Sequence, residues 1–476
     1  MTSAAPPVAG RASETIRPAP PPAQVPLGQR IYYGLGAIAY GVKDNGFQVF
    51  LLIYLNQVMG LDPGLVGLTL LAVLVLDALF DPLVGHWSDG TRTQWGRRHP
   101  FLYASALPIA LFWGLLWMPP AADAGWVAYA WVFGCALAVR MALSLNEVPS
   151  LALLPEMTSD PHERTAVLGW RYLFGWIGGL VTLALAYGVF HLIPVERARV
   201  ESFHLFAWTG AIAMFVAILL SAWGTHRRYA HPVPASVPHP ALRDMVGCIR
   251  FRPFRVLLVA AVFGFASQGV TFALTNYMLG FVWRLSAQGL LIYALILGVG
   301  VLLALALARQ IGPRLGKRRA AQLLTLATPI LAGMPYVLHL FGLLPDAQAA
   351  DRAAVFFAFV IASTATGVAG LVIAASMMAD VASAYRATTG QAREGVFFAG
   401  QWFTQKCVTG LGIFLVGQML VLVGFPANAT AGEVAPDVLR RLIALYIATI
   451  VLLHMGAAWA LSRFPLDERH LPPVQE

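Results

Sequence analysis

Apolar and polar positions alternate along this chain in long blocks. Runs of 20 or more mostly apolar residues recur from Ile31 to Leu461, separated by short segments with charged residues, proline and glycine. A helix of about 20 residues crosses the roughly 30 Å of hydrocarbon in a bilayer. Because backbone groups in lipid must be hydrogen-bonded within their own segment, each run is predicted to be a transmembrane helix.

The pattern predicts twelve helices. They are expected at 30–56, 64–87, 100–119, 125–153, 166–193, 204–225, 254–281, 287–309, 320–343, 353–384, 394–424 and 437–462. The predicted fold class is an all-α membrane protein.

The longest polar interruption, residues 226–253, divides this series into six plus six. It contains an amphipathic piece, Leu242 to Phe251, and is interpreted as a cytoplasmic linker with a surface helix. We therefore expect a six-helix half at 29–225 and a second at 254–463. Residues 1–28, rich in proline and alanine, are predicted to be a disordered tail, and 464–476 a second tail.

Composition supports a membrane protein and excludes several other classes. Hydrophobic residues make up 58% of the chain and charged residues only 12%, too few for a soluble globule of 476 residues. The net charge of +9 is scattered over short loops, which argues against nucleic-acid binding. Only six of the 32 Lys and Arg residues fall in the loops after odd-numbered helices, so both termini are predicted to be cytoplasmic, with the protein in the plasma (inner) membrane.

Nothing in the sequence points to catalysis. The three cysteines lack metal-ligand spacing, and His86, His99, His162 and His204 stand singly near helix ends. We predict a protein that is not an enzyme, with no metal site and no cofactor.

Charged residues inside the apolar runs are the exception to the pattern. Each costs about 2.5–3.5 kcal/mol at the bilayer centre on insertion scales, so each needs a partner or a function. Eight lie in such positions: Lys43, Asp44, Asp77, Asp81, Arg140, Glu147, Arg171 and Lys406.

Asp77 and Asp81 are four residues apart and share a helix face. Two carboxylates this close favour a proton or a sodium ion between them. If Lys406 neutralises one carboxylate, a net charge of −1 is left for a single cation, as in a coupling site. The other interpretation is a static ion-pair cluster that locks the second predicted helix to the eleventh.

A second group of polar residues suits a hydroxyl-rich solute. Pro149 weakens the helix beside Glu147 and frees carbonyl groups, while Asp44 and Arg171 add an acceptor and a donor. No partner is identified for Arg140. Candidates for an aromatic sugar-stacking platform are Trp170, Trp176, Tyr277 and Trp402.

Several of these stretches resemble one transporter family. They are Asp77-Ala78-Leu79-Phe80-Asp81-Pro82 with Gly85 and the turn TRTQWGRR from Thr91, then Glu147-Val148-Pro149, Leu154 to Thr158, His162 to Thr165, Thr389-Gly390-Gln391, Arg393-Glu394-Gly395 and Lys406. In these stretches the chain is similar to the glycoside–pentoside–hexuronide:cation symporters, typified by the melibiose permease, within the major facilitator superfamily. The resemblance covers most of the chain.

The resemblance implies a role for individual residues. Asp77 and Asp81 would bind the coupling cation, and Ser144 would add a hydroxyl. Substrate contacts would come from Asp44, Glu147 and Arg171, with Trp402 as a further candidate, while Lys406 and Lys43 would couple the two sites. A gating group on the cytoplasmic face would consist of Asp89, Arg92, Arg97, Arg98, Arg393 and Glu394.

Two positions depart from the family pattern. Phe80 replaces an amide just before the second aspartate, which favours protons over sodium, and Leu151 replaces a sugar-stacking tryptophan. We expect a monomeric symporter that couples H⁺ or Na⁺ to uptake of a sugar or glycoside. The alternative is a carrier of lysophospholipid or another amphipathic solute, whose marker would be an apolar lateral cleft with Glu147 turned away from it. The solute, the ion and the direction of transport stay open.

Overall fold

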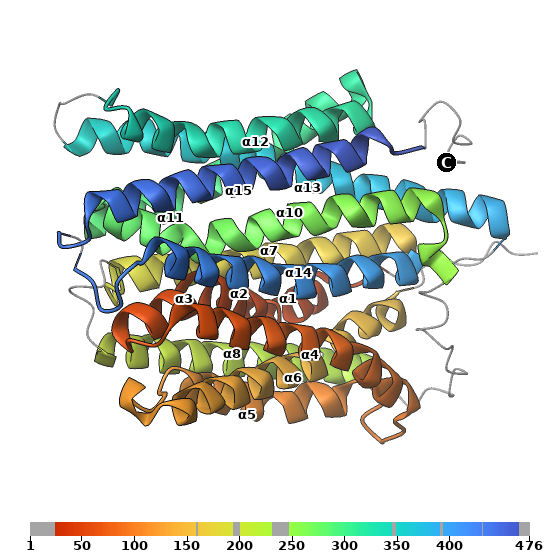
Figure 1. Ribbon diagram of the computed structural model, residues 1–476. Coiled ribbons are helices and arrows are strands. Elements are labelled where there is room, and N and C mark those ends of the chain that lie inside the picture. Colours follow the sequence, from red (N-terminus) through yellow and green to blue (C-terminus); the bar gives the residue numbers. More distant parts are fainter. Residues whose placement is uncertain are drawn as a thin grey trace, which may run out of the picture.

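The computed structural model describes residues 24–158, 160–193, 200–230, 247–344, 349–390, 394–430 and 432–465, and these residues form a bundle of helices that run side by side (Figure 1). Eleven helices within these ranges are long and apolar enough to cross a membrane. They are α4 (Pro63–Gly90), α5 (His99–Leu116), α6 (Trp126–Met157), α7 (Pro161–Gly188), α8 (Val200–Tyr229), α10 (Arg252–Tyr277), α11 (Ala287–Leu315), α12 (Lys317–Leu340), α13 (Ala349–Thr389), α14 (Glu394–Val423) and α15 (Pro436–Ser462). They correspond to the second to twelfth predicted helices.

The first predicted helix is broken. Residues 27–58 form α1 (Leu27–Leu35), α2 (Ile38–Asn45), the π-helical η1 (Gly46–Phe50), α3 (Leu51–Ile53) and a second π-helical segment, η2 (Tyr54–Val58). The prediction of one regular helix over 30–56 is therefore wrong. A third π-helical segment, η5 (Met278–Val282), ends α10 at the corresponding place in the second half. Such π turns are uncommon and often lie at functional sites.

Glycine in the first helix serves close packing. A Cβ atom at Gly41 would lie 2.3 Å from the carbonyl oxygen of Gly175 and 2.4 Å from the amide nitrogen of Gly179 in α7. Only glycine allows backbones to approach this closely, as is usual for helix contacts in membranes.

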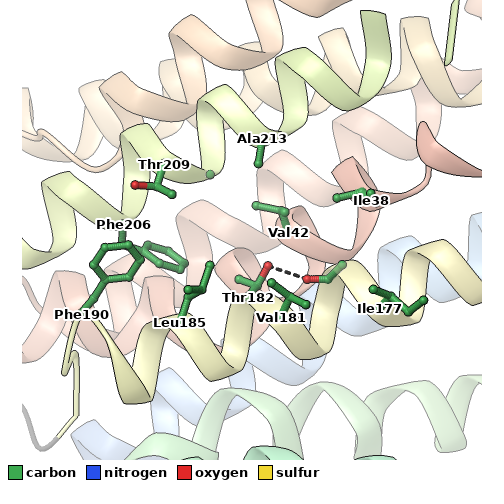
Figure 2. A pocket seen from close by; sticks show the side chains of 12 residues that line it. Ile38, Val42, Ile177, Val181, Thr182, Leu185, Phe190, Phe206, Thr209 and Ala213 are labelled. Carbon is green, nitrogen blue, oxygen red and sulfur yellow. Dashed lines mark hydrogen bonds between the residues drawn. The ribbon is translucent and has the colours of Figure 1, made fainter. Parts of the chain in front are cut away.

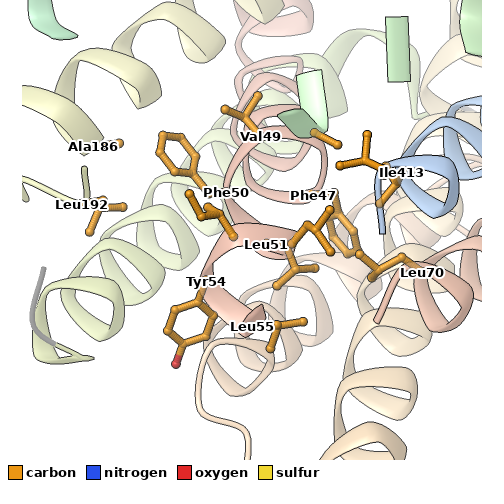
Figure 3. Close-up of a cluster of buried hydrophobic side chains, with 14 of the residues drawn as sticks. Phe47, Val49, Phe50, Leu51, Tyr54, Leu55, Leu70, Ala186, Leu192 and Ile413 are labelled. Carbon is orange, nitrogen blue, oxygen red and sulfur yellow. The ribbon is translucent and has the colours of Figure 1, made fainter. Parts of the chain in front are cut away.

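The two six-helix halves meet where α4 packs on α14, α7 packs on α11, and α10 packs on η1 and α3. The α4–α14 contact is lined by glycines; a Cβ at Gly417 would lie 2.3 Å from the carbonyl oxygen of Pro63. Figure 3 shows the buried core around the first broken helix, where Phe47, Phe50, Leu51, Tyr54 and Leu55 lie between Leu70 and Ile413 on one side and Ala186 and Leu192 on the other.

Hydrogen bonds close the seam between the halves at one end of the bundle, which we call the hydrogen-bonded end. Side chains of the first broken helix and of α10 supply most of them. The contacts are Gln57 Nε2 to Pro426 O (3.0 Å), Ala429 N to Gln57 Oε1 (3.0 Å), Tyr277 OH to Asn56 Oδ1 (3.0 Å), Asn276 Nδ2 to Val49 O (2.9 Å) and Tyr187 OH to Asn276 Oδ1 (2.8 Å).

The opposite end carries the basic turns that follow α4 and α11. Arg98 donates to Asp89 (2.6 Å) and Glu156 (3.2 Å), which ties its turn to the ends of α4 and α6. Lys317 donates to Asp380 (2.6 Å), which ties the start of α12 to α13. The two halves thus share one arrangement. In each, a basic residue after the second helix forms an ion pair with an acidic residue near the end of the fourth helix. Residues 231–246, with half of the predicted linker helix, lie outside the described part, so the domain boundaries stay a prediction.

Candidate functional site

A cluster of two carboxylates and a hydroxyl lies where α4, α6 and α14 meet. Asp77 is fully buried and Asp81, one turn further along α4, is partly buried. The Ser144 hydroxyl oxygen lies 2.7 Å from Asp77 Oδ1 and 2.6 Å from Asp81 Oδ1. A hydroxyl has one hydrogen to donate, so Ser144 satisfies one carboxylate at a time, and the cluster is suited to hold a proton between the two.

Arg140 is the ion-pair partner of Asp77. Its Nε donates to Asp77 Oδ2 at 2.9 Å and its Nη2 donates to the same oxygen at 2.5 Å. The guanidinium is buried and lies 5.6 Å from the ring centroid of Phe47. This answers the open question of the partner of Arg140.

Lys406 of α14 completes the cluster from the other half. Its Nζ lies 2.6 Å from Asp81 Oδ2, 3.3 Å from Asp77 Oδ2 and 3.4 Å from Ser144 Oγ. Asp77 and Asp81 thus face two cations, Arg140 and Lys406. The expected surplus of one negative charge is therefore wrong for this conformation, because Arg140 takes it up.

Glu147 lies one turn of α6 beyond Ser144 and is half-buried. Among the described residues its carboxylate makes no hydrogen bond and no ion pair. The cations that act on it electrostatically come from four helices: Lys43, Lys406, Arg171 and Arg140. A carboxylate that is surrounded by cations but paired with none of them is available to accept hydrogen bonds from a ligand.

Arg171 of α7 is also incompletely paired. Its Nη1 donates to Ser150 Oγ at 2.7 Å, while its Nη2 is buried without a hydrogen-bond partner in the described part of the chain. The guanidinium lies 4.8 Å from the ring centroid of Tyr40 and 5.6 Å from that of Tyr33. Glu147 and Arg171 thus offer an acceptor and a donor that the protein itself leaves unused.

Tyr33, Tyr40 and Ser150 were not predicted as site residues. Tyr40 also donates to Asn146 Oδ1 at 2.7 Å, which holds its ring beside Arg171. Tyr33 and Tyr40 are seven residues apart in the sequence, the spacing of two helical turns, and this repeat was the available signal.

Lys43 and Asp44 pair with each other. Lys43 Nζ lies 2.9 Å from Asp44 Oδ1, with side-chain exposures of 8% and 51%. The Asp44 carboxylate is therefore accessible, while the Lys43 ammonium is buried and also acts electrostatically on Glu147.

The aromatic candidates lie in different environments. Trp402 is four residues before Lys406 on α14, on the same helix face, and is 39% exposed. Trp170 packs on Phe174, and Trp176 is exposed. Tyr277 is buried at the hydrogen-bonded end, so its candidacy as a sugar platform is wrong; its ring packs between Phe281 and Phe425.

The predicted gating residues are only partly assembled. Arg97 and Arg98 both donate to Glu156 Oε1, and Arg98 to Asp89. Arg92 is exposed. Arg393 and the side chain of Glu394 lie outside the described residues.

An apolar cavity of about 130 Å³ lies between α2, α7 and α8 (Figure 2). Its lining is almost wholly apolar, and the hydroxyl of Thr182 donates back to Gly178 O at 2.7 Å. The other lining residues include Ile38, Val42, Ile177, Val181, Leu185, Phe190, Phe206, Thr209 and Ala213.

The chain matches known transporters over nearly its whole length. Residues 32–468 match the family described as MFS/sugar transport protein. The chain is 26% identical to the putative glycoside/cation symporter YagG of Escherichia coli over 95% of this chain and 94% of that protein. It is 24% identical to the isoprimeverose transporter of Lactiplantibacillus pentosus, over 85% of this chain and 82% of that one.

A solved structure confirms the fold. A bacterial homolog of the human lysosomal transporter Spinster superposes with a TM-score of 0.61 at 16% identity, covering 92% of this chain and 96% of that one. With a family match over most of the chain, this integral membrane protein belongs to the MFS/sugar transport protein family, the glycoside–pentoside–hexuronide:cation symporters.

Proposed function

We propose that the protein couples a monovalent cation to the transport of a sugar or glycoside by alternating access. The proposal rests mainly on one observation: Lys406 joins the acidic cluster of Asp77 and Asp81 to the other half. Lys406 also acts electrostatically on the unpaired Glu147. A site that holds a cation and joins two moving halves can link cation binding to their movement.

The coupling follows from competition at Asp81. In this conformation Lys406 donates to Asp81 and ties α14 to α4. A cation on Asp81 weakens that link and so changes the balance between outward-facing and inward-facing states. Differential affinity of the cation and the sugar for those states is what couples their movements.

The contacts between the halves support an inward-facing assignment. The hydrogen bonds from Lys406 to Asp81, from Gln418 to Gly64 and from Tyr277 to Asn56 join the halves at the Asp81–Lys406 level or toward the hydrogen-bonded end. With both termini cytoplasmic, as the loop charges predict, that closed end faces outward and the substrate site opens inward.

Substrate recognition would use Glu147 as acceptor and Arg171 as donor, with Asp44 as a further acceptor. Sugar hydroxyls are both donors and acceptors. A hydroxyl-rich solute therefore satisfies both unused groups at once, whereas an apolar solute would leave them unpaired at a cost.

Besides Phe80 and Leu151, the apolar cavity favours the amphipathic alternative. Its volume of about 130 Å³ is close to that of an apolar cavity that holds one benzene molecule. That space is too small to enclose a whole long acyl chain, and the unpaired Glu147 and incompletely paired Arg171 suit a hydroxyl-rich solute, so we favour the sugar or glycoside.

Purified protein in proteoliposomes tests this proposal. A panel of neutral disaccharides, a glucuronide and a lysophospholipid is offered under an imposed proton gradient, a sodium gradient and no gradient. We expect gradient-dependent accumulation of at least one glycoside. Accumulation of lysophospholipid alone, or of no solute under either gradient, contradicts the proposal.

A further inference from the structure

We propose that Arg140 is a resident cation that occupies the place of a metal ion at Asp77 and thereby excludes sodium from the cluster. This inference rests on the proposed function in one respect, that the cluster is the coupling site. If so, coupling depends on Asp81. The coupling cation must also bind without using an oxygen of Asp77, as a proton can.

Hydrogen-bond donors occupy three of the four carboxylate oxygens at any one time, because the single hydrogen of Ser144 serves one carboxylate. Asp77 Oδ2 accepts two bonds from Arg140, and Asp77 Oδ1 lies against the hydroxyl of Ser144. Asp81 Oδ1 meets the same hydroxyl, and Asp81 Oδ2 accepts from Lys406. A hard metal ion binds through oxygen lone pairs, so it would have to compete with these donors.

Arg140 cannot become neutral by losing a proton, so deprotonation cannot break its ion pair with Asp77. A guanidinium stays charged in proteins, and this one is buried with its ring neighbour Phe47 on one side and Asp77 on the other. A sodium ion at Asp77 would lie beside a fixed positive charge in a region of low dielectric, where repulsion is strong.

The two cations of the cluster also differ in their mobility. Arg140 and Asp77 belong to α6 and α4 of the same half, so their pair persists when the halves move apart. Lys406 belongs to α14 of the other half, so its bond to Asp81 can break during the cycle. Asp77 is thus a permanent counterion, and Asp81 is the carboxylate that changes partner.

The neighbouring residue adds no ligand. The ring of Phe80 packs edge-on against Trp87, with centroids 5.7 Å apart, and brings no oxygen to the cluster. The side chains that could hold sodium are therefore Asp77, Asp81 and Ser144, and both carboxylates already pair with the resident cations Arg140 and Lys406.

Thermal unfolding of the purified protein in NaCl, against equal concentrations of KCl, tests the inference without any transport assay. We expect no sodium-specific rise in Tm for the wild type. Arg140→Gln frees Asp77 and should gain a sodium-specific rise of about 2–4 °C at saturating salt. The double variant Asp77→Asn/Arg140→Gln, which lacks the freed carboxylate, should lose that gain.

Arg98→Gln is the matched control, because it removes a buried guanidinium from a different pair of acids. It should show no sodium response. A sodium-specific shift in the wild type, or its absence in folded Arg140→Gln, overturns the inference.

If Arg140→Gln does not fold, measurements on the wild-type protein still test the role of Arg140. Sodium-driven accumulation of a glycoside in proteoliposomes refutes the role of Arg140 while it supports the proposed function. Absence of accumulation under every gradient refutes the proposed function, whereas the sodium titrations of the wild type still report on Arg140.

Discussion

The two halves of the molecule share an arrangement of helices but differ in chemistry. Of the eight charged residues named above inside apolar runs, seven belong to the first half and only Lys406 belongs to the second, whose predicted span 353–384 also contains Asp380. In the described residues the core of the second half is lined by alanine, methionine and aromatic side chains, as around Met377, Met378 and Phe397. We infer that the first half holds the site, while the second supplies one cation and a surface that moves.

This asymmetry means that the halves communicate through very few polar groups near the centre. The Asp81–Lys406 pair is the central ionic link, and the hydrogen-bonded end is the second point of contact. Changes at each place should therefore have distinct effects.

Cutting the central link should have the largest effect. Asp81→Asn or Lys406→Gln removes the exchange of partners that couples the cation to the halves, so the accumulation ratio in proteoliposomes should fall to about one. Counterflow of labelled substrate should persist. Lys317→Gln is the control: it breaks a Lys–Asp pair of the same 2.6 Å length within the second half, and concentrative uptake should survive.

Asp77→Asn should mainly cost stability. It leaves the buried guanidinium of Arg140 without its carboxylate, and breaking a buried pair in this way costs about 3–5 kcal/mol. Chemical or thermal unfolding of the purified protein measures the loss. Asp77→Asn/Arg140→Gln should recover most of it; equal instability of the single and double variants would argue against the pair.

Glu147→Gln should weaken substrate binding and spare stability. Loss of one charge-assisted hydrogen bond is worth about 1.5–3 kcal/mol, or about 10–100-fold in Kd. Equilibrium binding of the glycoside identified in the panel gives this value. Glu163→Gln, which changes a carboxylate paired with Arg30, should leave Kd unchanged, and an equal loss in both variants would count against Glu147 as a contact.

Tyr277→Phe should have the smallest effect. It removes the hydroxyl that donates to Asn56 across the halves, worth about 1 kcal/mol, or about fivefold in the population of the state open at that end. Hydrogen exchange of residues 54–58 reports this opening. Tyr54→Phe is the control, because the Tyr54 hydroxyl donates to Trp117 O within one half at 2.7 Å; faster exchange in both variants would assign the effect to local loosening.

Much of the fold could be predicted because length and hydropathy are local properties of the sequence. The eleven long helices follow directly from apolar runs. The breaks in the first helix could not be predicted in this way. Hydropathy does not distinguish π-helical from α-helical turns, and contacts such as that of Gly41 with α7 join residues more than 130 positions apart.

The candidate site was predicted where residues on one helix share a face. Asp77 and Asp81 illustrate this, since four residues is one turn. Arg140 was missed as the partner of Asp77 because pairing across helices depends on how α4 and α6 are rotated against each other. A signal existed: Arg140 and Ser144 are also four residues apart, so a helix that brings Ser144 to the cluster brings Arg140 with it.

Glycines along the contact between α4 and α14, here called the glycine seam, bring the two helices close together because they have no side-chain atoms: Gly64, Gly67, Gly410 and Gly417. Gly417 lies three turns from Lys406 on the same helix, and its Cα faces the backbone of Pro63 with no room for a methyl group. The reach of a lysine is fixed, so its bond to Asp81 forms only while the helix backbones stay within that reach. The glycines therefore let the backbones of α4 and α14 touch. The Asp81–Lys406 ion pair can form only while the two helices keep this close contact.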